Sequence, residues 1–119
     1  MSEVLVGGVN ARVNGLGIEV ALEAVPASDV VSGSPRQGFA ELGSIGGCET
    51  GIWELRSGTV VDTEVDEIFV VLSGGATIEF LDEDRSVEVG VGDVMRLVAG
   101  SRTRWTVEDH IRKVYIAGQ

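Results

Sequence analysis

The sequence is poor in the residues that bind transition metals and form disulfides. Its 119 residues include one histidine, His110, and one cysteine, Cys48. A single cysteine excludes an internal disulfide and a cysteine-rich zinc site, and a single histidine excludes every multi-histidine metal centre. Basic residues are scarce too, because 9 lysines and arginines stand against 19 aspartates and glutamates, a formal net charge of −10. Such an acidic chain repels phosphate backbones and anionic lipid, so we expect neither nucleic acid nor a membrane surface as a partner.

Long apolar runs are also lacking. No run approaches the ~18 residues that cross a bilayer, and the first residues lack a basic segment followed by a hydrophobic one. With 44% hydrophobic and 24% charged residues, the chain can nevertheless bury a core. Its length suits one domain on the usual ~100–200 residues per domain. We therefore expect a single cytoplasmic domain over residues 1–119.

The composition favours β-sheet. The chain has 20 valines, 8 alanines and 17 glycines, and no long window shows helical periodicity. From residue 50 onward, short apolar runs alternate with turn signals at the ~8–12-residue spacing typical of a β-sandwich or barrel. The predicted strands are Gly51–Arg56, Ile68–Leu72, Ala76–Leu81, Ser86–Val89, Val94–Val98, Arg104–Val107 and Arg112–Ile116. The predicted turns between them are Ser57–Gly58, Ser73–Gly75, Asp82–Asp84, Gly90–Asp93, Ala99–Ser101 and Glu108–Asp109.

The first half of the chain has a looser pattern. Val4–Val9 and Leu16–Ala24 are possible strands, and the second of them alternates apolar with polar or small residues. Pro26–Gly38 predicts a connection, because it holds both prolines together with serine and glycine. Phe39–Leu42 is a possible short strand and Gly43–Gly47 a predicted loop. We therefore divide the domain into N-terminal strands and connection (1–49) and a barrel core (50–117).

Two stretches resemble the paired motifs of the cupin superfamily. Glu67–Gly74 (EIFVVLSG) reproduces the Glu-x6-Gly half of the first motif. Gly92–Thr103 (GDVMRLVAGSRT) keeps both glycines of the second motif, with Val98 for its proline and Thr103 for its histidine. The resemblance implies an all-β fold, a double-stranded β-helix or jelly-roll barrel.

Further pieces are similar to one branch of that superfamily, which contains the ureidoglycine aminohydrolase-type cupin domain. They are Gly51-Ile-Trp53-Glu54, Asp66-Glu67, Trp105 and Arg112-Lys113-Val-Tyr115. Cupins range from dioxygenases to sugar isomerases to storage proteins, so the resemblance implies a fold more than a reaction.

The metal ligands of the family, three histidines and a glutamate, are mostly absent here. The first two ligand positions fall on Val60 and Asp62 or on Val61 and Thr63, the third on Thr103, and Glu67 is retained. Asp62 and Glu67 could hold a hard cation such as Mg²⁺ through their oxygens, but they would be a sparse pair. A transition metal needs imidazole nitrogen or thiolate. We therefore expect no metal and no cofactor.

The alternation of side chains along each strand predicts which residues, in place of a metal, fill the barrel interior. If Glu67 points inward, Phe69, Val71 and Ser73 share its face. Thr103 at the third ligand position likewise brings in Trp105 and Val107, and the resemblance places Lys113 and Tyr115 inward. We hypothesise that Glu67 and Lys113 face each other and titrate as a coupled pair. The predicted ligand pocket comprises Trp53, Asp62, Glu67, Phe69, Thr103, Trp105, Lys113 and Tyr115.

Other conspicuous residues receive structural interpretations. His110 is expected in a solvated turn, and Cys48 as a small, half-buried filler without a basic neighbour to activate it. The acidic runs Glu64–Glu67 and Asp82–Asp84 are typical of solvated faces, apart from Glu67 itself. The basic cluster comprises Arg96, Arg102 and Arg104; it could meet an anionic ligand at the barrel mouth or pair with acidic surface.

Three functions remain open from the sequence. The first is metal-independent binding of a small polar metabolite inside the barrel, for example one that bears a carboxylate or amide. The second is an aminohydrolase-like enzyme acting on a ureide or amide, with Glu67 as base and Lys113 or Tyr115 as acid. The third is a structural domain whose pocket is filled by side chains. The resemblance also implies a homodimer, with residues 3–24 as an exchanged or interface element.

Overall fold

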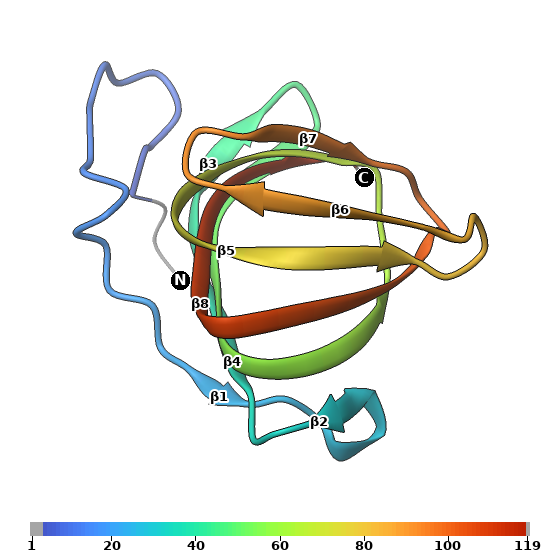
Figure 1. Cartoon of the computed structure of the whole chain (residues 1–119). Helices are drawn as coiled ribbons and strands as arrows, with labels where there is room; N and C mark the ends of the chain where they lie inside the picture. Colours follow the sequence, from blue (N-terminus) through green and yellow to red (C-terminus); the bar gives the residue numbers. More distant parts are fainter. Residues whose placement is uncertain (1–3, 119) are drawn as a thin grey trace.

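The computed structural model describes residues 4–118 and confirms an all-β jelly-roll barrel. Long, bent antiparallel strands close into the barrel (Figure 1). The strands are β1 (Glu23–Ala24), β2 (Val30–Ser32), β3 (Arg36–Ile45), β4 (Cys48–Thr63), β5 (Glu67–Phe80), β6 (Arg85–Gly90), β7 (Val94–Leu97) and β8 (Arg102–Ala117). One 3-10 turn, η1 (Ala27–Asp29), precedes β2. None of the helical segments described is long and apolar enough to span a membrane.

Three long strands close the barrel by changing neighbours along their length. The sheet order is β1-β3-β4-β8-β5-β6, with β2 added to β4 and β7 added to β5. The first part of β4 pairs with β3 and its last part with β2. Similarly, β5 pairs first with β7 and then with β6, while β8 lies between β4 and β5 throughout. The two halves of the sheet therefore face each other, and alternate side chains of these strands fill the space between them.

Three of the predicted turns are wrong, because the strands continue through them. Ser57–Gly58 lies within β4, Ser73–Gly75 within β5 and Glu108–Asp109 within β8, and the pairing register shifts beside each of these segments. At Gly74, φ is +70° and a Cβ atom would collide with the carbonyl oxygen of His110. Glycine inside a strand marks a bulge that bends it. The glycines therefore mark corners of the barrel rather than strand ends.

One of these bulges reverses a predicted side-chain direction. Val71 pairs with Lys113, whereas Ser73 pairs with Arg112, so Leu72 is the extra residue of the bulge. Because side chains alternate, Ser73 lies on the outer face with Arg112 and not inside the barrel as predicted. The inward direction predicted for Phe69 and Val71 is confirmed, since both are buried in the core.

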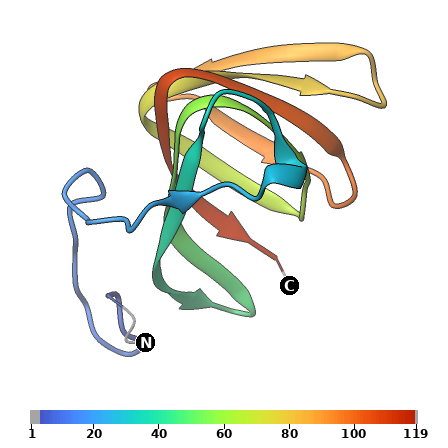
Figure 2. The same ribbon diagram turned by 90° about the horizontal axis from the view of Figure 1, so that it is seen from below.

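The predicted strand Val4–Val9 is wrong, and Leu16–Ala24 is a strand only at Glu23–Ala24. The segment 4–22 instead lies along the outside of the barrel (Figures 1 and 2). Its carbonyl groups pass so close to β3 that a Cβ on Gly38 or Gly43 would collide with them. Its backbone bonds to β3 only locally, from the Leu5 N–H to the Leu42 carbonyl, and residues 4–22 form no continuous strand pairing in spite of their strand propensity.

The rest of the first half is more ordered than predicted. The strand predicted at Phe39–Leu42 is confirmed and extends to the full length of β3. The loop predicted at Gly43–Gly47 shrinks to the turn residues Gly46 and Gly47, both with positive φ, as a two-residue hairpin turn requires. The connection Pro26–Gly38 contains η1 and β2 and leads into β3.

Candidate functional site

A cavity of about 330 Å³ opens inside the barrel, with walls from β3, β4, β5, β8 and the turn after β4. Six of the eight predicted pocket residues line it: Trp53, Asp62, Glu67, Trp105, Lys113 and Tyr115. The other two, Phe69 and Thr103, are fully buried and lie behind the lining side chains. The structure therefore brings the predicted set together around one space.

An ion pair lies at the wall of this cavity. The Lys113 Nζ atom is 2.5 Å from Glu67 Oε2, and the two side chains are only 6% and 10% exposed. The hypothesised facing arrangement of Glu67 and Lys113 is thus present. A buried pair of this kind holds its two residues in one geometry, because separating the charges would leave each of them without solvent.

Three aromatic rings surround the same ammonium group. Lys113 Nζ lies 4.4 Å from the ring centre of Phe69, 4.6 Å from that of Trp53 and 5.0 Å from that of Trp105. The two tryptophan rings themselves meet edge to face at 5.4 Å. Ring faces attract a cation through their negative quadrupole, and more strongly where water is excluded. The ammonium is therefore stabilised by both a carboxylate and aromatic faces.

Glu64 is a site residue that the sequence interpretation missed. The acidic run predicts a solvated face for it, but it is 7% exposed and lines the cavity. Thr103 Oγ1 donates to Glu64 Oε2 at 2.7 Å, and Trp105 Nε1 donates to the same oxygen at 3.0 Å. One signal could have revealed it: Thr103 stands at a ligand position where its hydroxyl needs an acceptor.

Asp62 lies beside Glu64 where the cavity opens. Partial burial and the charge of Glu64 raise the pKa of Asp62 to about 6, although the residue as a whole stays exposed to solvent. Its Oδ1 atom accepts a hydrogen bond from the Thr63 backbone N–H at 2.8 Å, which opposes that rise. Asp62 can therefore exchange a proton near neutral pH.

Tyr115 contributes a hydroxyl group to the cavity lining. Burial raises the pKa of Tyr115, and the charges of Glu49, Glu67 and Glu41 raise it further. The phenol consequently stays protonated at neutral pH and can both donate and accept a hydrogen bond.

The residues at the family's metal positions do not fit a divalent metal ion. The one retained glutamate, Glu67, already binds the Lys113 ammonium, whose positive charge would repel a metal cation. Thr103, at the third position, offers a hydroxyl that is already bonded to Glu64. Among the residues that the structure describes, no three His, Cys, Asp or Glu side chains are grouped to hold a metal ion.

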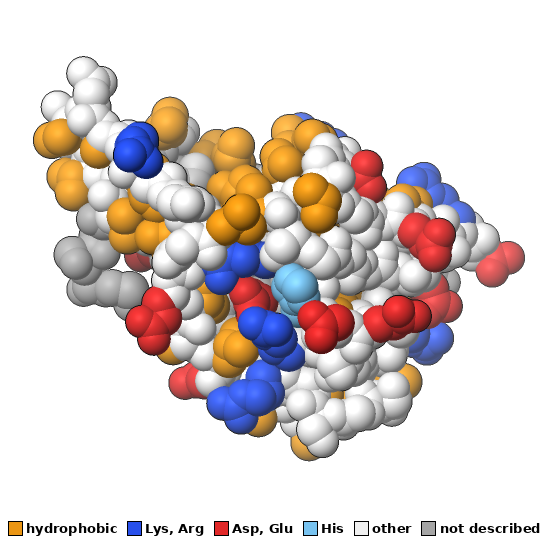
Figure 3. Space-filling view, turned by 60° about the vertical axis from the view of Figure 1, so that its left-hand side comes forward, with side chains coloured by type: hydrophobic (Ala, Val, Ile, Leu, Met, Phe, Trp, Pro, Cys, Tyr) orange, Lys and Arg blue, Asp and Glu red, His pale blue; other side chains and the backbone are white. Residues whose placement is uncertain are grey.

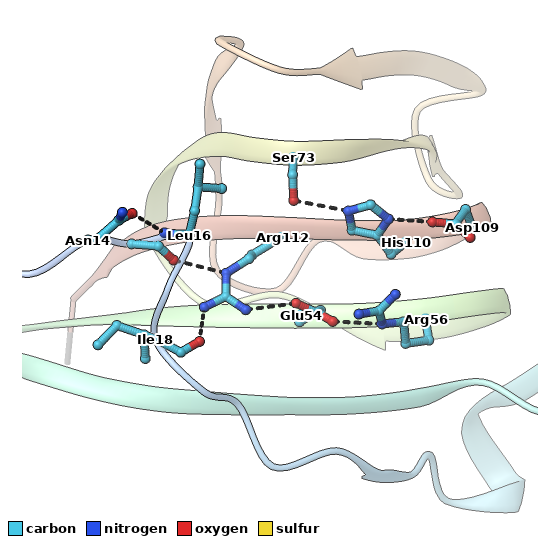
Figure 4. Close-up of polar contacts among 10 residues, drawn as sticks. Asn14, Leu16, Ile18, Glu54, Arg56, Ser73, Asp109, His110 and Arg112 are labelled. Carbon is cyan, nitrogen blue, oxygen red and sulfur yellow. Dashed lines mark hydrogen bonds and ion pairs between the residues drawn. The ribbon is translucent and has the colours of Figure 1, made fainter.

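A second polar cluster lies on the outer face, beneath the N-terminal segment (Figure 4). Arg112 donates from Nη1 to Glu54 at 2.9 Å, from Nε to the Gly15 carbonyl at 2.9 Å, and from Nη2 to the Ile18 carbonyl. Glu54 also pairs with Arg56 at 2.7 Å. Arg112 is buried, so this cluster fastens residues 14–18 to the sheet.

His110 belongs to the same face and not to a solvated turn, which corrects the prediction. Figure 3 shows acidic and basic side chains gathered around the histidine. Its Nε2 atom is 3.0 Å from Ser73 Oγ and its Nδ1 atom 2.5 Å from Asp109 Oδ2 (Figure 4). This order resembles a serine hydrolase triad. The Asp109 side chain, however, is 86% exposed, and Ser73 does not line the neighbouring groove.

Two of the three residues of the basic cluster pair with acidic surface residues. Arg102 binds Asp82 at 2.5 Å and Arg104 lies 3.7 Å from Glu79. Cys48 is half-buried at the start of β4, as expected for a filler. The observed contacts of Arg102 and Arg104 are therefore with acidic surface residues.

Comparison with solved structures supports the fold. The EutQ protein of Clostridium difficile has a TM-score of 0.66 and 22% identity over 85% of this chain and 80% of its own. A putative ethanolamine utilization protein Q from Salmonella typhimurium has a TM-score of 0.60 and 15% identity, over 84% and 95%. A DUF861-family protein of unknown function from Pseudomonas syringae pv. tomato has a TM-score of 0.73 and 18% identity, over 87% and 45%.

The sequence comparisons place the chain in a family. No curated protein sequence matches it significantly. Residues 42–115, more than half of the chain, match the EutQ-like cupin domain, and this range runs from the end of β3 to Tyr115. The barrel, the two glycine-bearing motifs and this match agree, and the chain belongs to the EutQ-like cupin domain family.

Proposed function

We propose that the barrel cavity binds a small polar metabolite without the help of a metal ion. The observation that carries this proposal is the cavity of about 330 Å³ with the Lys113–Glu67 pair at its wall. Small-molecule sites are concave, largely apolar and supplied with a few converging polar groups. Here the rings of Trp53 and Tyr115 supply the apolar walls, and Lys113 retains N–H donors beyond the one used by Glu67.

A structural role with a filled pocket is less well supported. Side chains do not occupy the cavity, and polar atoms of Asp62, Glu64 and Glu67 line it. A barrel that served only as a scaffold would gain stability by filling this space with apolar side chains. The polar cavity therefore favours a binding function.

An aminohydrolase-like activity on a ureide or amide is the second candidate. Asp62 favours it, because a carboxyl group with a pKa of about 6 can take up and return a proton near neutral pH. Glu67 is less suited to the role of base assigned to it from the sequence, since its carboxylate is held by Lys113. Release of ammonia from allantoate-like or simple amide substrates, abolished in Asp62→Asn, would establish this reaction in place of simple binding.

The binding proposal is tested by thermal denaturation of EDTA-dialysed protein against a panel of small amines, carboxylates, ureides, amides and sugars. A ligand that binds the folded state raises the melting temperature, by mass action. Ethanolamine belongs in the panel because one solved neighbour is named for its utilization. At a ligand concentration of 100 Kd the stabilisation is about 2.7 kcal/mol, well within detection.

Two matched variants make this experiment specific to the cavity. Val65 lines the cavity and Val91 is exposed elsewhere, so Val65→Trp narrows the cavity while Val91→Trp adds the same side chain outside it. We expect the thermal shift to disappear in the first variant and to persist in the second. Equal shifts in both variants, or no shift across the panel, would contradict binding in the barrel.

A further inference from the structure

The charges around the cavity are unbalanced. Its lining includes five acidic residues and one basic residue. The acidic residues are Asp29, Glu49, Asp62, Glu64 and Glu67, and the basic one is Lys113. The Lys113 charge is matched by Glu67 at 2.5 Å. The remainder of the lining therefore carries net negative charge.

Glu64 shows this imbalance most clearly. It is 7% exposed, yet among the ion pairs of the described residues none includes it. Its hydrogen bonds come from the neutral donors Thr103 and Trp105, both to Oε2. A buried carboxylate without a cationic partner is costly, and a cation placed in the adjoining cavity would lower that cost.

The cavity already binds an ammonium group of its own. Lys113 Nζ is held by Glu67 together with the rings of Phe69, Trp53 and Trp105. Carboxylates beside aromatic faces are the usual surroundings of organic ammonium ions in binding sites. Glu64, Asp62, Trp53 and Tyr115 also line the cavity, so it offers further carboxylates and aromatic faces to a ligand.

We propose that the ligand of the barrel is a small organic cation, an amine or alkylammonium ion, whose charge lies against Glu64 and Asp62. This inference rests on the proposed binding function and replaces the carboxylate-bearing ligand considered from the sequence. An anionic ligand would be repelled by the carboxylates of Glu64 and Asp62, whereas an ammonium ion meets opposite charge and aromatic surface. Lys113 then donates a hydrogen bond to a hydroxyl or carbonyl group at the other end of the ligand.

The test uses ligands of one shape and three charges. Choline, 3,3-dimethylbutan-1-ol and 3,3-dimethylbutanoate share a branched tail and differ in charge, and ethanolamine, ethylene glycol and glycolate form a smaller series. Binding is followed by isothermal titration calorimetry and by fluorescence of Trp53 and Trp105, both of which line the cavity. We expect the cation of at least one series to bind at least tenfold more tightly than its neutral and anionic analogues.

Glu64→Gln and Glu88→Gln provide the matched variants. Both remove one negative charge, but Glu88 is exposed on β6 and Glu64 lines the cavity. In Glu64→Gln the amide oxygen of the new side chain can still accept the hydrogen bonds of Thr103 and Trp105, so the fold is expected to survive. We expect cation affinity to fall roughly tenfold or more in Glu64→Gln, the usual loss for a hydrogen bond to a charged group, and to stay unchanged in Glu88→Gln.

The outcomes separate the two proposals. Neutral or anionic analogues that bind as tightly as the cations, or an unchanged affinity in Glu64→Gln, would overturn the cationic ligand while leaving a binding site in place. Absence of binding by every member of both series, together with no thermal shift across the wider panel, would overturn the binding function itself.

Discussion

At the scale of single residues, the centre of the barrel is organised by one lysine. The resemblance implies that metal-bearing cupins hold a cation with three histidines and the glutamate that corresponds to Glu67. In this chain, Lys113 binds Glu67 at 2.5 Å and lies over three rings. The Lys113 ammonium group thus supplies a positive charge to Glu67, the residue at the position that the cupin resemblance assigns to a metal ligand.

Removing Lys113 is expected to destabilise the protein more than removing the charge of Glu67. Lys113→Met leaves the Glu67 carboxylate buried against aromatic rings, at a cost of about 3–5 kcal/mol in the free energy of unfolding. Glu67→Gln costs less, because the ammonium group keeps its three rings. The double variant should lose less than the sum of the single losses, as measured by urea denaturation. Additive losses would mean that the two charges do not interact.

Asp62 makes the stability of the folded protein depend on pH. Its pKa of about 6 in the folded protein exceeds the value of 3.8 for a free aspartate, so the folded state binds the proton more tightly. Ionised Asp62 therefore weakens the fold above pH 6, and this penalty disappears as pH falls from 6 toward 4. We expect Asp62→Asn to raise the melting temperature by a few degrees at pH 8, with a smaller gain at pH 4.5.

The control for this pH effect is Glu88→Gln, which removes an exposed charge from the same acidic chain. Because the partly exposed Asp62 is screened by solvent, the gain at pH 8 should stay near ~1 kcal/mol. A gain in Asp62→Asn that is the same at both pH values, or that Glu88→Gln reproduces, would show that Asp62 is not the group responsible.

Most of these residues could be predicted from the sequence, some by strand parity and others only by the motif resemblance. Parity puts Lys113 and Tyr115 on one face of β8, but it was the resemblance that implied that this face points inward. Glu64 escaped prediction since it lies just beyond the end of β4, where alternation no longer specifies a side. Local acidic composition suggested solvent there, whereas the long-range partners Thr103 and Trp105 draw the side chain inward.

At the scale of elements, bulges account for the differences between predicted and observed strands in the barrel core, residues 50–117. The apolar runs were located correctly, but glycines that resemble turn residues, such as Gly58 and Gly74, lie inside long strands. A glycine permits either a turn or a bulge, and only the pairing with a distant strand decides between them. The same reason explains why Ser73 was assigned to the wrong face.

The N-terminal segment is attached to the barrel mainly by side-chain hydrogen bonds and not by the backbone hydrogen bonds of paired strands. Arg112 binds the carbonyl groups of Gly15 and Ile18 and is itself paired with Glu54. We expect Arg112→Met to release this segment and to increase trypsin cleavage after the exposed Arg12 by roughly tenfold, the loss expected for such charge-assisted bonds. Intact mass spectrometry of timed digests measures this rate.

Arg56→Met is the matched control for the segment. Arg56 contacts the same glutamate, Glu54, at 2.7 Å, yet its side chain is 48% exposed and no described hydrogen bond joins it to the N-terminal segment. Its loss should leave cleavage after Arg12 at the wild-type rate. Equal rates in Arg112→Met and the wild-type protein would contradict the attachment described here.

At the scale of the whole molecule, we propose that two copies associate through the outer face of the sheet. Val94, Ile116 and Ile68 lie on this face across β7, β8 and β5 and are 65%, 51% and 39% exposed. Light scattering should give about twice the chain mass of 12.5 kDa, and Ile68→Glu should reduce it to the monomer. A monomeric mass for the wild-type protein at all concentrations would contradict this association.

The central claim is that the barrel encloses a ligand site organised around Lys113 and not around a metal ion. The most direct measurement follows the indole N–H signals of Trp53 and Trp105, the only tryptophans of the chain, by NMR in EDTA-dialysed protein. The account predicts that a cationic ligand from the panel shifts the Trp105 signal, whose N–H donates to Glu64, and that added Mn²⁺ leaves both signals sharp. Indole signals that no ligand moves, but that one equivalent of Mn²⁺ broadens selectively, would contradict it.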